Sequence, residues 1–98
     1  MLELGGNIKL VGFTDLEPAK LVVVKKLVGN YARKLSDHVS PFQELSVILK
    51  EVQAEKKQYE VSGTVIFDGR SPITSEATDY NLFFGLDKSL SQLLNGAH

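Results

Sequence analysis

Residues 75–90 read SEATDYNLFFGLDKSL, and they contain the change from strand to helix on which the fold prediction rests. Thr78 or Asp79 can cap a helix here, because short polar side chains accept hydrogen bonds from the first free amides of a helix. An Asn-Gly pair near residue 95 can end that helix. The apolar residues on one helical face are Phe83, Leu86, Leu90, Leu93 and Leu94. We therefore predict an amphipathic helix over about residues 79–95.

The same stretch holds an aromatic cluster. The chain has five Phe and three Tyr, and Tyr80, Phe83 and Phe84 lie close together. Such a cluster is either a surface on which nucleic-acid bases stack or part of a core. Phe83 falls in the apolar stripe with Leu82 beside it, so we expect both in the core. Tyr80 and Phe84 fit the stripe less well and are expected at its border.

The N-terminal part of the chain predicts a strand and then a long helix. Residues 8–13, IKLVGF, form a short strand-like run. Thr14 and Glu17 match a capping box, which predicts a helix over about 15–38. Its apolar face consists of Leu21, Val24, Val28, Tyr31, Leu35 and Val39. The alternative takes LVVVKKLV as a strand followed by a Gly-Asn hairpin turn, because β-branched residues favour strands.

The middle of the chain predicts three strands joined by hairpins. Residues 45–53 and 59–67 are rich in β-forming residues, and the polar AEKKQ between them suits a hairpin loop. The following DGRSP reads as a second hairpin turn, so a further strand is expected over about 72–77.

These elements give the order β-α-β-β-β-α, which is an α+β fold. The first two strands, joined by a helix, should be parallel through a right-handed crossover, and the hairpins make the other pairs antiparallel. A four-stranded mixed sheet of this size buries one face, so both helices should pack on that face. With 98 residues, a single domain over 1–98 is expected.

Composition excludes several classes of function. The chain has no Cys, which excludes a disulfide frame, a thiolate metal site and a cysteine nucleophile. The N-terminus lacks signal-peptide features and no apolar run could span a bilayer, so a soluble cytoplasmic protein without a membrane partner is expected. The net charge of -1 gives no argument for binding nucleic acid.

Catalytic signals are weak. His38 lies beside Asp37, with Ser36 and Ser40 near, but neighbours at a helix end do not face one another as a catalytic triad requires. No glycine-rich phosphate loop and no metal-ligand spacing occurs. We therefore expect no enzyme, no catalytic residue, no cofactor or metal and no small-molecule substrate.

The placement of the basic residues is more informative than their number. Five of the eleven fall in the first predicted helix, namely Lys20, Lys25, Lys26, Arg33 and Lys34. Lys26, Asn30 and Arg33 share one exposed face at i, i+4 and i+7, which would form a basic stripe opposite the buried stripe. A solvated helix face is the plain alternative. Arg70, at a hairpin tip, could contact a phosphate or be solvated.

The element order and three segments together resemble the ribosome hibernation-promoting factor family, also called the ribosome-associated inhibitor A or protein Y family. The segments are IKLVGFTD entering the first helix, the turn FDGRSP, and SEATD leading into DKSLSQL. The resemblance covers nearly all of the chain and corresponds to the short form of the family. It implies a β-α-β-β-β-α domain that binds the small ribosomal subunit near the decoding region and inhibits translation when growth stops.

Members of that family contact ribosomal RNA through basic side chains. The matching positions here are Lys25, Lys26, Arg33 and Lys34 in the first helix, with Lys88 in the second. This chain departs from the family pattern at its end, SQLLNGAH, which has no cation after Lys88 where relatives have a Lys- and Arg-rich segment.

A second hypothesis is a protein-interaction module, either a homodimer or a peptide binder. It would use an edge strand or the open face of the sheet, where Ile48, Val52 and Ile66 are expected to point away from the helices.

Overall fold

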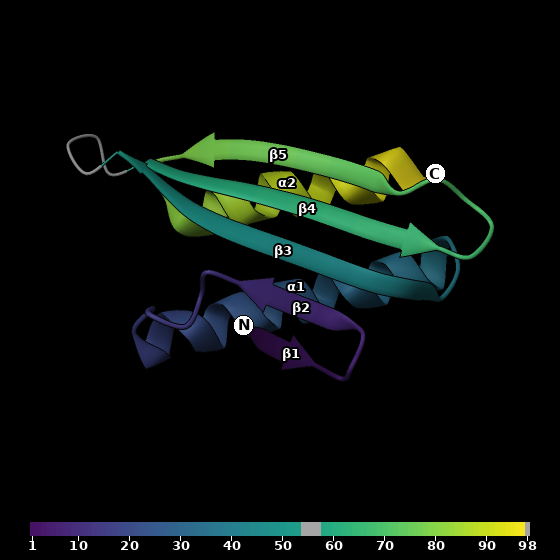
Figure 1. The fold of residues 1–98 in the computed structure, drawn as a ribbon, viewed down its shortest axis with the longest axis horizontal. Coiled ribbons are helices and arrows are strands. Elements are labelled where there is room, and N and C mark those ends of the chain that lie inside the picture. Colours follow the sequence, from purple (N-terminus) through teal and green to yellow (C-terminus); the bar gives the residue numbers. More distant parts are fainter. Residues whose placement is uncertain (54–57, 98) are drawn as a thin grey trace.

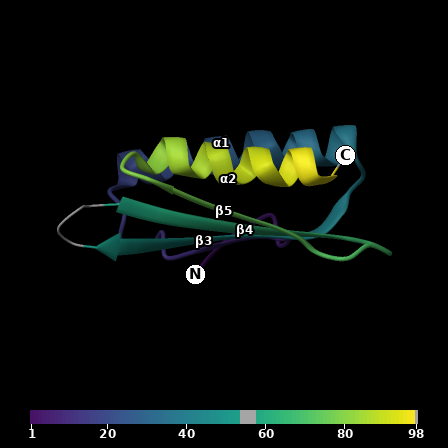
Figure 2. The same ribbon diagram turned by 90° about the horizontal axis from the view of Figure 1, so that it is seen from above.

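A computed structural model describes residues 1–53 and 58–97, which form a sheet with two helices on one of its faces (Figures 1 and 2). The strands are β1 (Leu2–Leu4), β2 (Ile8–Val11), β3 (Phe42–Gln53), β4 (Gln58–Phe67) and β5 (Ile73–Asp79). The helices are α1 (Pro18–His38) and α2 (Leu82–Ala97). The predicted α+β class and the placement of both helices on one face are confirmed. Residues 54–57, most of the expected AEKKQ loop, lie outside the described residues.

The sheet has five strands in the order β1-β2-β3-β4-β5, so the prediction of four strands was one short. The extra strand, β1, pairs antiparallel with β2, with Leu2 opposite Leu10. Gly5 and Gly6 form the connecting turn with φ of 66° and 82°, a conformation that glycine adopts without strain. The sequence LELGGN shows both the alternation and the turn, but a strand of three residues is too short for a periodicity argument.

The connections follow the predicted topology. β2 and β3 are parallel, with Ile8 opposite Leu45, and α1 forms the crossover between them. The pairs β3–β4 and β4–β5 are antiparallel, as hairpins require. α2 packs on β4 and β5, whereas α1 lies beside α2 and over β3.

The start of α1 differs from the prediction. The helix begins at Pro18, three residues later than expected, and Glu17 at the N-cap makes no side-chain capping bond. The predicted capping box of Thr14 and Glu17 is therefore wrong. Proline explains the difference, because its fixed φ suits the first helical position and it disfavours helical geometry in the residue before it. The alternative of a hairpin at Gly29 is also wrong, since α1 continues through that residue to His38.

The start of α2 differs in a similar way, because β5 continues to Asp79. The cap is Asn81, whose Oδ1 accepts hydrogen bonds from the backbone N–H of Phe83 (2.9 Å) and of Phe84 (3.1 Å). Asp79 Oδ1 in turn accepts the N–H of Asn81 at 2.8 Å. Thr78 and Asp79 thus belong to the strand, and neither is the cap. At the other end α2 continues through the predicted stop to Ala97.

The core lies between the helices and the sheet. The buried stripe of α1 is Val24, Val28, Ala32 and Leu35, and that of α2 includes Leu86, Leu90 and Leu93. On the sheet, β4 alternates buried and half-buried residues from Val61 to Phe67, as a strand with one covered face should. Phe83 packs against this core and Leu82 is buried, as predicted.

Small residues let α2 approach the sheet closely. Gly63 of β4 lies opposite Ser75 of β5 and beneath Leu93 and Ser89 of α2. A Cβ atom on Gly63 would lie 2.8 Å from Leu93 Cδ1 and 2.8 Å from Ser75 Oγ, closer than real atoms approach. The two hydroxyls, Ser75 Oγ and Ser89 Oγ, form a buried hydrogen bond of 2.7 Å. The distance between α2 and the sheet is therefore set by residues without bulk.

We predict that Gly63→Ala lowers the free energy of unfolding by about 1–3 kcal/mol, because the added methyl group overpacks this contact. The measurement is urea unfolding followed by circular dichroism. Gly29→Ala is the matched control, since nothing lies within 4 Å of its Cβ position in the middle of α1. That control should gain about 1 kcal/mol through helix propensity. Equal stability of Gly63→Ala and the parent protein would contradict the close approach of α2.

Candidate nucleic-acid interface

α1 presents three polar side chains to solvent on the side opposite its buried stripe. Lys26, Asn30 and Arg33 are all exposed. At 100° per residue they fall within about 60° around the helix axis. The face expected from the i, i+4, i+7 spacing therefore exists, and contact with RNA through it stays a prediction.

Of the other two α1 cations that the resemblance predicts to contact RNA, Lys34 lies at the α2 margin of this face and Lys25 lies beyond its other margin. Lys34 is exposed, and its Nζ lies 4.8 Å from the ring centroid of Tyr31 on the side toward α2. Lys25 is nine residues before Lys34, which places it about 180° away around the axis. We use the name α1 basic face for Lys26, Asn30, Arg33 and Lys34, and Lys25 lies outside it. Within residues 1–53 and 58–97, no ion pair involves any of these cations.

The α1 basic face is held in place by a link between the helices. The Tyr31 hydroxyl donates a hydrogen bond of 2.7 Å to Asp87 Oδ1 on α2. Partial burial, then this hydrogen bond, raises the pKa of Tyr31 to about 12. A shallow groove of about 300 Å³ follows the same junction, and it is lined by Val23, Lys26, Leu27, Asn30, Phe83 and Asp87. α1 therefore cannot rotate without breaking contacts to α2.

Lys88 and Arg70 lie apart from the α1 basic face. Lys88 Nζ is 2.8 Å from Asp79 Oδ2, and this hydrogen bond, with that from the Asn81 N–H, lowers the pKa of Asp79. Arg70 Nη1 donates to the carbonyl oxygen of Ala97 at 3.1 Å, and its guanidinium lies 5.4 Å from the centroid of the Phe67 ring. These two cations attach the two ends of α2 to the β5 side of the sheet. The structure does not bring them together with the α1 cations.

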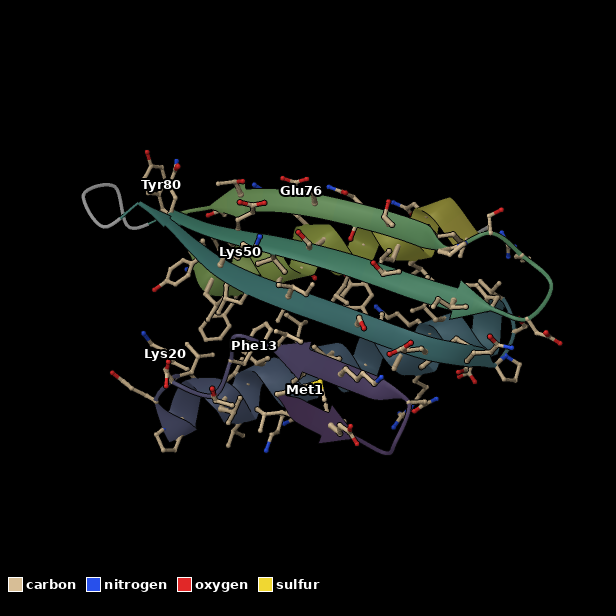
Figure 3. All side chains as sticks on the ribbon, viewed as in Figure 1. Met1, Phe13, Lys20, Lys50, Glu76 and Tyr80 are labelled. Carbon is tan, nitrogen blue, oxygen red and sulfur yellow. The ribbon has the colours of Figure 1, made fainter. Side chains whose placement is uncertain are left out.

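The face of the sheet away from the helices carries a small apolar patch. Met1 is exposed there (Figure 3), and so are Val11 and Ile48, which are register partners on β2 and β3. Ile66 is half-buried, and the Val52 side chain lies outside the described part of the chain. Beside the patch, Lys9 Nζ and Glu44 Oε1 form an ion pair of 2.8 Å, which raises the pKa of Lys9.

The β5 edge of the sheet is partly closed. Gln92 of α2 donates through Nε2 to the carbonyl of Glu76 and accepts the N–H of the same residue through Oε1, both at 3.2 Å. A carboxamide in this position takes the two backbone groups that an added strand would need. This contact disfavours the hypothesis that β5 binds a peptide or a second chain by strand addition.

In the residues that the structure describes, no other kind of functional site is found. They contain no group of three or more His, Asp or Glu that could hold a metal ion. No described helix is long and apolar enough to cross a bilayer. His38 is the last residue of α1 and is exposed, as is Asp37.

The sequence reasoning missed two exposed aromatic residues. Tyr80 is 65% exposed and Phe84 is 64% exposed, so neither lies at the border of the core, as had been expected. Helical spacing contains the signal for Phe84, which falls about 160° from Leu86 around α2. Tyr80 lies in the bend between β5 and α2, where no periodicity applies.

No protein-family model and no curated protein matches the chain. Several solved structures share its fold, among them the following two. One is the N-terminal domain of Protein Y from Thermus thermophilus, with 15% identity, a TM-score of 0.65 and coverage of 92% of this chain and 91% of that chain. The other is a ribosomal subunit interface protein from Coxiella burnetii, with 17% identity, a TM-score of 0.62 and coverage of 93% and 90%. At these identities the likeness shows the fold.

We predict a pH dependence from the link between Tyr31 and Asp87. The folded pKa of Tyr31 lies above the value near 10 of an unfolded chain, so its stabilising effect is complete below about pH 10 and is lost as the pH rises toward 12. Tyr31→Phe should therefore be less stable than the parent at neutral pH, by about 1 kcal/mol. That difference should shrink above about pH 10.

Urea unfolding of both proteins at a series of pH values measures this difference. Tyr80→Phe is the control, because no hydrogen bond of the described residues involves the exposed Tyr80 hydroxyl. A gap between the parent and Tyr31→Phe that stays constant across this pH range would mean that the link between the helices is absent in solution.

Proposed function

We propose that this chain is a cytoplasmic, ribosome-associated translation inhibitor that binds small-subunit ribosomal RNA through the α1 basic face. The observation that carries the proposal is an unpaired set of cations on a rigid helix, in a fold that a ribosomal subunit interface protein also has. The overall charge of -1 makes this placement important, because a chain of that net charge binds RNA only where its cations are gathered.

The chemistry required for such binding is limited to phosphate neutralisation. Lys26, Arg33 and Lys34 can each release counterions from a phosphate, and Asn30 can donate a hydrogen bond to phosphate or sugar. The buried stripe of α1 and the hydrogen bond from Tyr31 to Asp87 fix these side chains to one rigid frame. No nucleophile or cofactor is needed, because a bound domain inhibits by occupying RNA that mRNA or tRNA would otherwise use.

The other three residues predicted to contact RNA could do so only under further conditions. Lys25 needs an RNA surface that wraps around α1. Lys88 would have to leave Asp79, and Arg70 would have to leave the Ala97 carbonyl. We therefore place the main contacts on the α1 basic face and treat Lys25, Lys88 and Arg70 as peripheral. Hibernation in non-growing cells is the role that this proposal assigns to the complex.

A homodimer through the open sheet face is the second candidate, and the patch of Met1, Val11 and Ile48 favours it. Among the described side chains the patch has these three exposed apolar residues, and it borders the ion pair of Lys9 and Glu44. Stable interfaces usually bury about 800 Å² on each partner, which is more than three side chains supply. We therefore rank this candidate below the ribosomal one.

We predict that the variant Lys26→Glu/Arg33→Glu/Lys34→Glu loses binding to small ribosomal subunits in co-sedimentation. The parent protein should bind saturably, and its affinity should fall steeply as salt is raised. Loss of three phosphate contacts should lower the slope of log affinity against log salt by about 2 to 3.

The matched control is Lys50→Glu compared with Lys26→Glu, since each changes one exposed lysine to glutamate and Lys50 lies on the open sheet face (Figure 3). Only Lys26→Glu should weaken binding. Unchanged affinity and salt slope in the triple variant would show that RNA does not contact the α1 basic face. Failure of the parent protein to bind subunits at any salt would exclude the proposed function.

A further inference from the structure

The end of the molecule where both helices begin contains a hollow with aromatic walls. The helices run in the same direction, so Lys20 in the first turn of α1 and the bend before α2 lie at one end (Figures 1 and 3). The hollow measures about 210 Å³ and is lined by Lys20, Tyr59, Tyr80, Asn81, Leu82 and Phe83. We call it the end hollow.

Three aromatic side chains and one amine define its chemistry, and one of the three, Phe83, also packs against the core. Tyr80 is 65% exposed, and Tyr59 is half-buried at the start of β4. Lys20 is exposed and forms no ion pair with any residue that the structure describes. Asp79, the last residue of β5 and the neighbour of Tyr80 in sequence, already pairs with Lys88. An occupant should thus have a flat surface for the rings and a negative charge for the amine.

We propose that the end hollow binds one unpaired nucleotide of an RNA chain, with its base stacked on Tyr80 and its phosphate beside Lys20. The proposal rests on the proposed function, which brings RNA to the neighbouring α1 basic face. Any base can stack on an aromatic ring, and a base in a duplex is unavailable because it is already stacked. The volume is below that of typical drug-sized ligand pockets, which suits a single base.

The position of the end hollow beside α1 favours RNA as its occupant over a peptide that packs on aromatic rings. Lys20 lies six residues before Lys26, about 9 Å along the helix axis, and about 120° around that axis on the α2 side, where it is within about 40° of Lys34. A strand that contacts Lys26 with one phosphate can therefore present a nearby nucleotide to the end hollow. A proline-rich peptide would use the rings but gains nothing from the unpaired Lys20.

Stacking gives the end hollow a different physical signature from the α1 basic face. Phosphate contacts weaken as salt rises because they release counterions, whereas stacking depends on the presence of the base. The contribution of Tyr80 should therefore persist at raised salt and should vanish when the base is removed from the RNA.

The test measures the affinity of a labelled single-stranded RNA of about eight nucleotides by fluorescence anisotropy. A second probe has the same sugar-phosphate chain with abasic positions. Tyr80→Ala is compared with Phe84→Ala, because Phe84 has nearly the same exposed fraction, 64%, but does not line the end hollow. Lys20→Ala is compared with Lys50→Ala in the same way. Circular dichroism confirms that each variant is folded.

We expect Tyr80→Ala to bind the RNA about 5- to 150-fold more weakly than the parent, the range for loss of one stacked base. Phe84→Ala and Lys50→Ala should bind as the parent does, and Lys20→Ala should bind more weakly with a smaller salt slope. The abasic probe should not distinguish Tyr80→Ala from the parent.

Equal RNA affinity of Tyr80→Ala and the parent would overturn the proposal, as would equal losses in Tyr80→Ala and Phe84→Ala. Displacement of the RNA from the end hollow by a proline-rich peptide that binds more tightly would assign it to a peptide instead. A parent protein that co-sediments with small subunits but shows no dependence on Tyr80 would exclude the end hollow alone. A parent that binds neither probe nor subunits would exclude the proposed function as well.

Discussion

The close approach of α2 to β4 and β5 is the constraint on which the other features depend. Gly63 leaves room for Leu93, and the buried hydrogen bond between Ser75 and Ser89 joins helix to sheet at the same place. Once α2 is fixed there, Asp87 is presented to Tyr31, which orients α1. The start of α2 also supplies one wall of the end hollow. A bulkier contact at Gly63 would move all of these features together.

The two helices have different roles as a result. The polar groups of α2 are largely engaged within the molecule, with Lys88 on Asp79, Gln92 on the backbone of Glu76 and Asp87 on Tyr31. Among the described residues, no lysine or arginine of α1 forms an ion pair; all of them are exposed, and Lys34 Nζ lies over the Tyr31 ring. An interface for a polyanion is therefore expected on α1, although both helices cover the same face of the sheet. This division also fits the cation-poor end of the second helix in the sequence.

Periodicity was sufficient to predict the mixed sheet, the exposed face of α1 and every element except the three-residue strand β1, because burial repeats at fixed spacing in helices and strands. It failed where local chemistry decides a boundary. Pro18 sets the start of α1 in place of the Thr14 capping box, and Asn81 caps α2 in place of Thr78 or Asp79. Contacts between residues distant in the sequence could not be predicted either. No sequence pattern shows that Lys88 pairs with Asp79, or that Tyr31 reaches a residue 56 positions away. Such contacts decide which cations form ion pairs within the molecule and which stay available to bind a partner.

Lysine reactivity in the complex tests the central claim most directly. The purified protein, alone and bound to small ribosomal subunits, would be treated briefly with an acetylating reagent, and the modified lysines identified by mass spectrometry. Binding through the α1 basic face should protect Lys26 and Lys34 and leave Lys50 on the open sheet face as reactive as in the free protein. Protection of Lys50, with Lys26 and Lys34 still reactive, would place the sheet against the ribosome and contradict RNA binding through α1.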